Sequence, residues 1–171
     1  DMTVDEYLYH CADIRLMPKA EIPSAVERAK AKCGISHFSK RVIGNLSGGY
    51  QQRVGIAQSI IHDPMFVILD EPTNGLDPNQ ILEIRDLIRE IAQDHSVLLS
   101  THILSDVERI CTEVAFLHDG KIAMQGTIAE LRNKRVSDGF IIEIEQKEVA
   151  DVLINVFGDF QYTEKNSLVF H

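Results

Sequence analysis

The stretch Phe66-Val67-Ile68-Leu69-Asp70-Glu71-Pro72-Thr73 decides the fold class. Four apolar residues run directly into two adjacent carboxylates. Such a run has the length of a buried strand in a parallel sheet, and the carboxyl end of such a strand lies at the sheet edge where ligands bind in open α/β folds. Asp70 there suits Mg²⁺, and Glu71 suits a general base or a water-positioning group in phosphoryl transfer. The alternative is a pair of solvated acids at the start of a loop.

The residues that follow predict a strand–helix–strand unit. Asp77, Pro78 and Gln80 have the residue types preferred at the first positions of a helix, which we expect to run to about residue 92. Residues 96–100 form a second short apolar strand. Continuous apolar strands that alternate with helices predict a parallel sheet covered by helices on both faces.

Ser100-Thr101-His102 stands at the end of the second strand, so we expect His102 at the same sheet edge as Glu71. An imidazole in that position could bond a γ-phosphate. The alternative for a lone histidine is a polar side chain at a strand end with no further role.

A second polar string, Leu46-Ser47-Gly48-Gly49-Tyr50-Gln51-Gln52-Arg53, opens a helix that ends before Pro64. Ser47 is the expected N-cap, and the two glycines leave the backbone N–H groups of the first turn uncovered. A bare helix N-terminus with a hydroxyl is suited to bind a phosphate. The alternative is a simple capped helix after a glycine turn. Asp77, at the end of Asn74-Gly75-Leu76-Asp77, has the same ambiguity, because it is also a helix cap.

The flanking segments predict further elements. Residues 1–45 have helical spacing, with a Thr3/Glu6 capping box and a second helix that begins near Pro23 and ends at Gly34. The remaining expectations are a short helix over 104–111, a hairpin with strands 114–117 and 121–124, a strand over 140–145, a helix over 148–157, and strands over 161–163 and 168–170.

Composition narrows the function classes. The chain has 171 residues, 44% of them hydrophobic and 25% charged, with a formal net charge of -9. These values exclude a disordered chain or a coiled-coil rod, and the acidity argues against a nucleic-acid partner. No apolar run approaches the roughly 20 residues of a membrane-spanning helix.

In this order and spacing, the polar strings resemble the ATPase of an ATP-binding cassette (ABC) transporter over roughly residues 1–132. LSGGY matches the family signature, VILDE the Walker B strand with its catalytic glutamate, NGLD the D-loop, and THIL the switch histidine. HDGKIAMQGT resembles the segment that closes the cassette.

The resemblance implies roles for individual residues. Glu71 and His102 are the implied catalytic residues, and Asp70 is the implied Mg²⁺ ligand. The implied ATP-binding residues, which contact the nucleotide of a partner subunit, are Ser47, Gly48, Gly49, Tyr50 and Asp77. Tyr50 departs from the usual glutamine of the signature, but its hydroxyl can still donate a hydrogen bond.

The sequence contains no GxxxxGK[ST] phosphate-binding loop. The resemblance places that loop upstream of Asp1, so the fold expected here is a partial P-loop NTPase of the α/β class. Its expected parts are a helical subdomain over 1–63, the C-terminal half of the ATPase core over 64–132, and the start of a small α+β accessory domain over 133–171. Without the loop, we expect this chain to be inactive alone.

The family further implies a cytoplasmic protein on the inner face of the membrane, paired with a second cassette and a transmembrane permease subunit. The form of the signature and of the histidine segment resembles bacterial ABC-2 type exporters. One alternative is an ABC-type ATPase of DNA maintenance or repair, although such proteins have coiled coils or zinc modules and lack a residue like His102. The other is a non-enzymatic remnant that only binds a partner, against which the complete set of Asp70, Glu71 and His102 argues.

Overall fold

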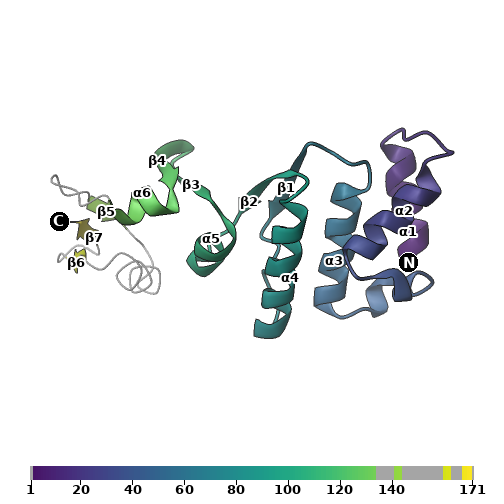
Figure 1. The fold of residues 1–171 in the computed structure, drawn as a ribbon. Coiled ribbons are helices and arrows are strands. Elements are labelled where there is room, and N and C mark those ends of the chain that lie inside the picture. Colours follow the sequence, from purple (N-terminus) through teal and green to yellow (C-terminus); the bar gives the residue numbers. More distant parts are fainter. Residues whose placement is uncertain (1, 134–140, 144–159, 163–166, 171) are drawn as a thin grey trace. The chain divides into compact units, whose positions relative to one another are not determined.

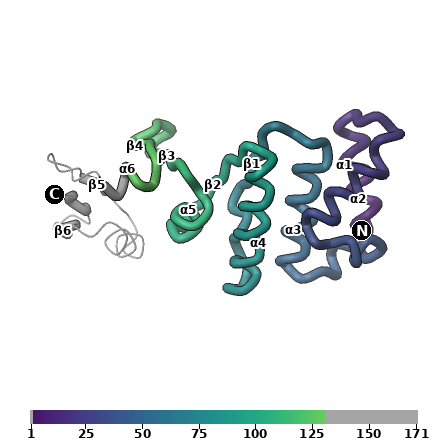
Figure 2. Tube along the Cα trace, in the orientation of Figure 1, coloured from purple at the N-terminus to yellow at the C-terminus, as the bar shows by residue number. Residues whose placement is uncertain are grey.

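The computed structural model describes residues 2–133, 141–143, 160–162 and 167–170. The chain divides into two compact units, Asp1–Ile110 and Cys111–His171 (Figures 1 and 2). The three segments expected from the sequence, over 1–63, 64–132 and 133–171, are defined by function and not by compactness. They therefore remain a prediction.

The first unit begins with a helical part. It consists of α1 (Val4–Ile14), α2 (Ile22–Lys32), two short 3₁₀ helices η1 (Ser36–Phe38) and η2 (Ile43–Asn45), and α3 (Gly48–Ile60). The capping box of α1 is confirmed, because Thr3 N donates to Glu6 Oε2 at 2.8 Å and Glu6 N donates to Thr3 Oγ1 at 3.3 Å. The three long helices pack against one another around a common apolar core, whose members include Leu8, Val26 and Ala57.

A buried cation ties the first two helices together. Lys30 Nζ donates to Asp5 Oδ1 at 2.6 Å and to Ser39 Oγ at 2.8 Å, and it lies 2.8 Å from Glu27 Oε1. Burial alone would lower the pKa of Lys30, but hydrogen bonds to Asp5 and Glu27 outweigh it, so that the pKa is raised and the ammonium stays charged.

The helical part is joined to α4 (Pro78–Ile91) by exposed ion pairs and by shared core residues. Lys32 Nζ lies 3.3 Å from Glu90 Oε1 and 3.1 Å from Asp94 Oδ2. Arg53 donates to the Cys33 carbonyl and to Glu83 Oε2, both at 3.0 Å. The bond from Arg53 to Glu83 holds α3 against α4.

Two parallel strands, β1 (Phe66–Asp70) and β2 (Ser96–Ser100), follow the helical part and pair in register, with Asp70 opposite Ser100. The strand–helix–strand order expected from the sequence is confirmed. Val67 and Leu69 share a buried cluster with the apolar stripe of α4, whose buried members are Ile84, Leu87, Ile88 and Ile91. The unit closes with α5 (Leu104–Ile110).

The expectation that helices cover both sheet faces is wrong for this chain. Burial alternates along β1, so that Leu69 is 6% exposed while its neighbour Ile68 is 63% exposed. Phe66 and Leu98 are also exposed. Successive side chains of a strand point to opposite faces, and the described residues cover only one of them. The continuous apolar run predicts a strand that is buried on both faces, whereas the described residues bury only one of them.

The second unit begins with a hairpin of β3 (Glu113–His118) and β4 (Lys121–Thr127). Asp119 and Gly120 both have positive φ (49° and 71°), as a type I′ turn requires, so the predicted turn is confirmed. A capping box between Thr127 and Glu130 then opens α6 (Ile128–Asn133).

The last described strands are β5 (Ile141–Glu143), β6 (Phe160–Tyr162) and β7 (Ser167–Phe170). They form an antiparallel sheet in the order β5-β7-β6, at the places where the sequence predicts strands. The expected helix over 148–157 lies outside the described residues. Within the described part of the chain, no helix is both long and apolar enough to cross a membrane.

The one-sided burial of β1 predicts a contrast between two neighbouring substitutions. In the 171-residue chain, Leu69→Ala should cost about 2–5 kcal/mol of unfolding free energy, because it leaves a cavity in the core. Ile68→Ala should cost about 1 kcal/mol or less, because that side chain is already in water. Urea denaturation measures both. Equal large losses would mean that the exposed face is covered in solution.

Candidate functional site

The pairing of β1 with β2 brings the polar ends of both strands to one sheet edge. Beyond the Asp70–Ser100 pair, Glu71 N donates to the Ser100 carbonyl at 2.9 Å and continues the ladder by one bond. Asp70 is exposed at this edge, and His102 follows two residues after Ser100. The expectation that Asp70, Glu71 and His102 share one edge is confirmed.

Glu71 and His102 are in direct contact. Glu71 Oε1 accepts hydrogen bonds from His102 N at 3.1 Å and from His102 Nδ1 at 2.8 Å. The second oxygen, Oε2, is buried and has no hydrogen-bond partner among the described residues. An unpaired carboxylate oxygen out of bulk water is unfavourable unless a ligand or a water fills the place, so this atom points to a missing partner.

The backbone at Glu71 is also unusual. Its φ is 45°, in the left-handed region that costs a non-glycine residue about 1 kcal/mol or more. Such a conformation persists only when neighbouring contacts hold it. Here Asn74 N donates to the Glu71 carbonyl at 3.1 Å, in addition to the bond from Glu71 N to Ser100.

The Asp70 carboxylate is of the kind that binds a magnesium ion. In the described part of the chain, no three His, Cys, Asp or Glu side chains gather as a complete metal site would need. Magnesium, however, is commonly bound by one or two carboxylates together with substrate phosphates and water. Asp70, which is exposed at the sheet edge, supplies a hard oxygen ligand of that kind.

The N-terminus of α3 leaves polar groups available. Ser47 has the extended backbone of an N-cap (φ -64°, ψ 158°), but in the described structure its side chain makes no capping hydrogen bond. Ser47 and Gly48 are exposed. The first backbone N–H groups of a helix have no intrahelical partner, so an anion could bind there.

The two glycines of α3 differ in their surroundings. A Cβ on Gly48 would meet only Leu76 Cδ2 at 3.5 Å, an ordinary contact. A Cβ on Gly49 would meet Gln80 Cδ at 3.0 Å and Cγ at 3.1 Å, and Gly49 is buried. From the sequence we expect both glycines to be there so that a phosphate can approach the backbone N–H groups of the first turn. In the structure Gly49 has a packing reason of its own, because α3 and α4 approach closely at this point.

Tyr50 belongs to an aromatic cluster with η1. Its ring lies edge-on to Phe38, with centroids 4.6 Å apart, and to His37 at 5.9 Å. The guanidinium carbon of Arg41 lies over the Phe38 ring, 5.7 Å from its centroid. The half-buried Tyr50 ring is therefore held against the helical part, which accounts for an aromatic residue at this position.

Asp77 caps α4, as the sequence predicts. Its Oδ1 accepts hydrogen bonds from Asn79 N at 3.0 Å and Gln80 N at 2.9 Å. The neighbouring Leu76 lies beside Gly48, so the segment before α4 and the N-terminus of α3 are close together in the same chain. The contribution of Asp77 to nucleotide binding remains a prediction.

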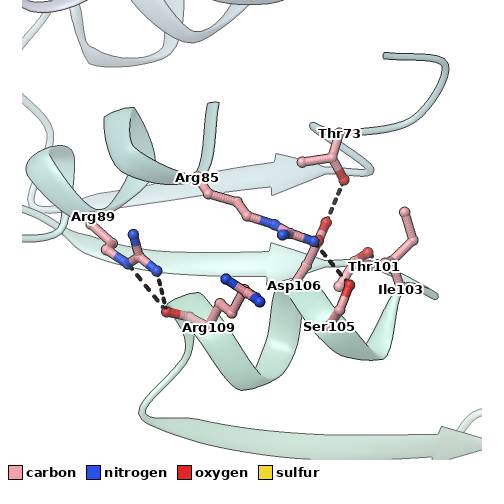
Figure 3. A network of polar contacts seen from close by, with 8 residues as sticks. All are labelled: Thr73, Arg85, Arg89, Thr101, Ile103, Ser105, Asp106 and Arg109. Carbon is pink, nitrogen blue, oxygen red and sulfur yellow. Dashed lines mark hydrogen bonds and ion pairs between the residues drawn. The ribbon is translucent and has the colours of Figure 1, made fainter. Parts of the chain in front are cut away.

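Sequence reasoning missed a buried polar group next to the site (Figure 3). Asp106 on α5 accepts hydrogen bonds from Thr73 Oγ1 and from the guanidinium of Arg85 on α4. One signal was available, because Arg85 falls on the apolar stripe of α4 beside Ile84 and Ile88. A charged residue on the inner face of a helix requires a buried partner.

Comparison with known proteins finds similar sequences among ABC transporter proteins. The family described as "ABC transporter" matches residues 1–74. An uncharacterized ABC transporter ATP-binding protein of Bacillus subtilis, YxlF, is 33% identical over 146 residues, which are 85% of this chain and 50% of that protein. Over most of its length the chain is similar to ATP-binding proteins of ABC transporters.

Other comparisons agree with this family. The bacitracin transport ATP-binding protein BcrA of Bacillus licheniformis is 41% identical over 101 residues, 58% of this chain and 33% of that protein. The structure of CbiO1 from Clostridium perfringens, part of the ABC transporter complex CbiONQ, matches 90% of this chain and 57% of its own, with 28% identity and a TM-score of 0.68. The chain spans about half the length of the curated relatives it matches.

The cap geometry of α4 predicts a purely structural effect at Asp77. In the 171-residue chain, Asp77→Ala should lower the free energy of unfolding by about 0.5–2 kcal/mol, because two N–H groups lose their acceptor. Asp77→Asn keeps a cap oxygen and should stay close to the wild-type stability. Urea denaturation of the three proteins makes the comparison. An alanine variant as stable as the wild type would contradict the capping role.

Proposed function

We propose that the whole protein to which this chain belongs binds and hydrolyses ATP to drive an ABC transporter. The observation that carries the proposal is the contact between Glu71 and His102 at the carboxyl edge of two parallel strands. Phosphoryl transfer needs a group that orients and deprotonates water, and a group that senses the terminal phosphate. Glu71 takes the first role and His102 the second.

The geometry constrains how His102 can act. Its Nδ1 donates to the Glu71 carboxylate, so only Nε2 is left to meet a phosphate. In a neutral ring with the proton on Nδ1, Nε2 is an acceptor and cannot bond an anionic oxygen. A hydrogen bond to phosphate therefore requires the doubly protonated ring, or a rotation that releases Nδ1 from Glu71.

The nucleotide and metal have defined places in this proposal. Asp70 would hold Mg²⁺, which would neutralise charge on the phosphates. Glu71 accepts the proton of the attacking water. Ser47, Gly48 and the first-turn N–H groups of α3 bind a phosphate of the nucleotide held by a partner cassette, with Gly49, Tyr50 and Asp77 completing that surface. The phosphate-binding loop GxxxxGK[ST], which the 171 residues lack, belongs to the remainder of the cassette, and this chain alone is inactive.

The proposed assembly is a pair of cassettes with a transmembrane permease subunit, on the cytoplasmic face of the membrane. The forms LSGGY and THILSDVE favour an ABC-2 type exporter. The relatives reported above are transport ATP-binding proteins, and they lend no support to a DNA-maintenance ATPase. The acidic net charge of -9 also disfavours such a role.

The proposal is tested by Glu71→Gln in the full-length protein. Glutamine keeps the size and the Oε1 acceptor for His102 but removes the base, so hydrolysis should fall by ~10²–10⁴ while ATP still binds. Phosphate release and equilibrium ATP binding measure the two effects. Glu21→Gln, on an exposed glutamate outside the site, is the matched control. Unchanged turnover would refute the base assignment, and a wild type without hydrolysis would favour the non-enzymatic remnant.

The signature surface is tested by Gly48→Asp in the full-length protein. Gly48 is the better position because a side chain at Gly49 would strike Gln80 and confound charge with packing. A carboxylate close to the partner's phosphate should cost a few kcal/mol and abolish ATP-dependent dimers, while monomers still bind ATP.

Gly55→Asp is the control for that experiment. It adds the same charge on the same helix, at an exposed glycine whose Cβ would meet nothing within 4 Å. Light scattering with ATP should detect dimers of the Gly55 variant and not of the Gly48 variant. Normal dimers of both would contradict the proposed signature surface.

A further inference from the structure

A fully buried carboxylate lies between the two loops of the candidate site (Figure 3). Asp106 is 0% exposed, and its side chain accepts hydrogen bonds from two other segments of the chain. Oδ2 accepts from Thr73 Oγ1, in the loop after β1. Oδ1 accepts from Arg85 Nε at 2.8 Å and from Arg85 Nη2, on α4. Arg85 Nη2 also donates to Ser105 Oγ at 2.9 Å, which fixes the guanidinium against α5.

These contacts join the segments that carry Glu71 and His102. Thr73 is two residues after Glu71, and Asp106 is four residues after His102. The bond from Thr73 to Asp106 therefore links the loop after β1, which carries Glu71, to α5, the helix that follows His102. Next to His102, Ile103 N donates to Thr101 Oγ1 at 3.1 Å, and Asp106 N donates to the Ile103 carbonyl at 2.9 Å. These two hydrogen bonds fix the backbone between His102 and α5.

Stability alone gives little reason for this arrangement. Desolvation of two charges can cost as much as their attraction returns, and buried ion pairs are often replaceable by apolar residues without loss. The neighbouring backbone offers a reason, because Glu71 is held at φ 45° and needs contacts that over-determine it. Thr73 and Asn74, on the same loop, supply such contacts.

We propose that Asp106, through its bond to Thr73, is a positioning residue that holds Glu71 and His102 in contact. Asp106 is fully buried, away from the surface where a substrate would bind. It acts by fixing the loop after β1 to α5, so that the carboxylate and the imidazole meet at hydrogen-bond distance. The kinetic part of this inference rests on the proposed ATP hydrolysis, whereas the structural part does not.

The test is Thr73→Val in the full-length protein, with Thr73→Ser as the matched variant. Valine keeps the shape and removes only the hydroxyl, whereas substitution of Asp106 would leave Arg85 buried without a partner and endanger folding. The turnover number should fall roughly 10–10²-fold in the valine variant with KM for ATP within about twofold, as expected for displaced catalytic groups. The serine variant should return turnover to within about threefold of wild type. Equal turnover in wild type and valine variant, or no rescue by serine, would overturn the proposal.

A second measurement does not depend on activity. In ¹H–¹³C NMR spectra of the full-length protein, the ring signals of His102 should move in Thr73→Val and remain near their wild-type positions in Thr73→Ser. His37 and His62, in the helical part, are internal references and should not move. Unchanged His102 signals in the valine variant would also overturn the proposal. If wild type does not hydrolyse ATP but the His102 signals move as expected, the proposed function fails and the positioning role stands.

Discussion

The in-register pairing of β1 with β2 is the constraint on which the rest of the site depends. Asp70 lies opposite Ser100, and the next ladder bond, from Glu71 N to the Ser100 carbonyl, brings the two strand ends together. A shift by one residue would turn every side chain of β1 to the other face, burying Ile68 in place of Leu69. The core under the sheet and the site at its edge are thus specified by the same register.

The candidate site combines strain with an incomplete set of partners. Glu71 has a left-handed backbone, one oxygen bound to His102, and one buried oxygen without a partner among the described residues. A carboxylate in this state is favourable only if something else supplies the missing contact. A water molecule at this oxygen would do so, in keeping with the proposed role of Glu71 as the base. The buried hydrogen bond between Thr73 and Asp106 holds the strained loop against α5.

One face of the β1–β2 pair is both apolar and exposed. Phe66, Ile68 and Leu98 form apolar surface that the described residues do not cover. The chain spans about half the length of the curated relatives it matches. An apolar run such as that over 66–69 is typical of a strand that is covered on both faces.

The sequence alone determined the local structure and the residue types of the site. Capping residues such as Thr3 and Asp77, the Asp119-Gly120 turn and the apolar run before Asp70 act through neighbours in the chain, so their effects can be predicted without the fold. The tertiary structure decided what depends on distant contacts. It gave Gly49 its closeness to Gln80, packed Tyr50 on Phe38, left one face of β1 exposed, and joined Thr73, Arg85 and Asp106. Such contacts arise between segments far apart in sequence, where periodicity shows that a side chain faces inward but not what it meets there.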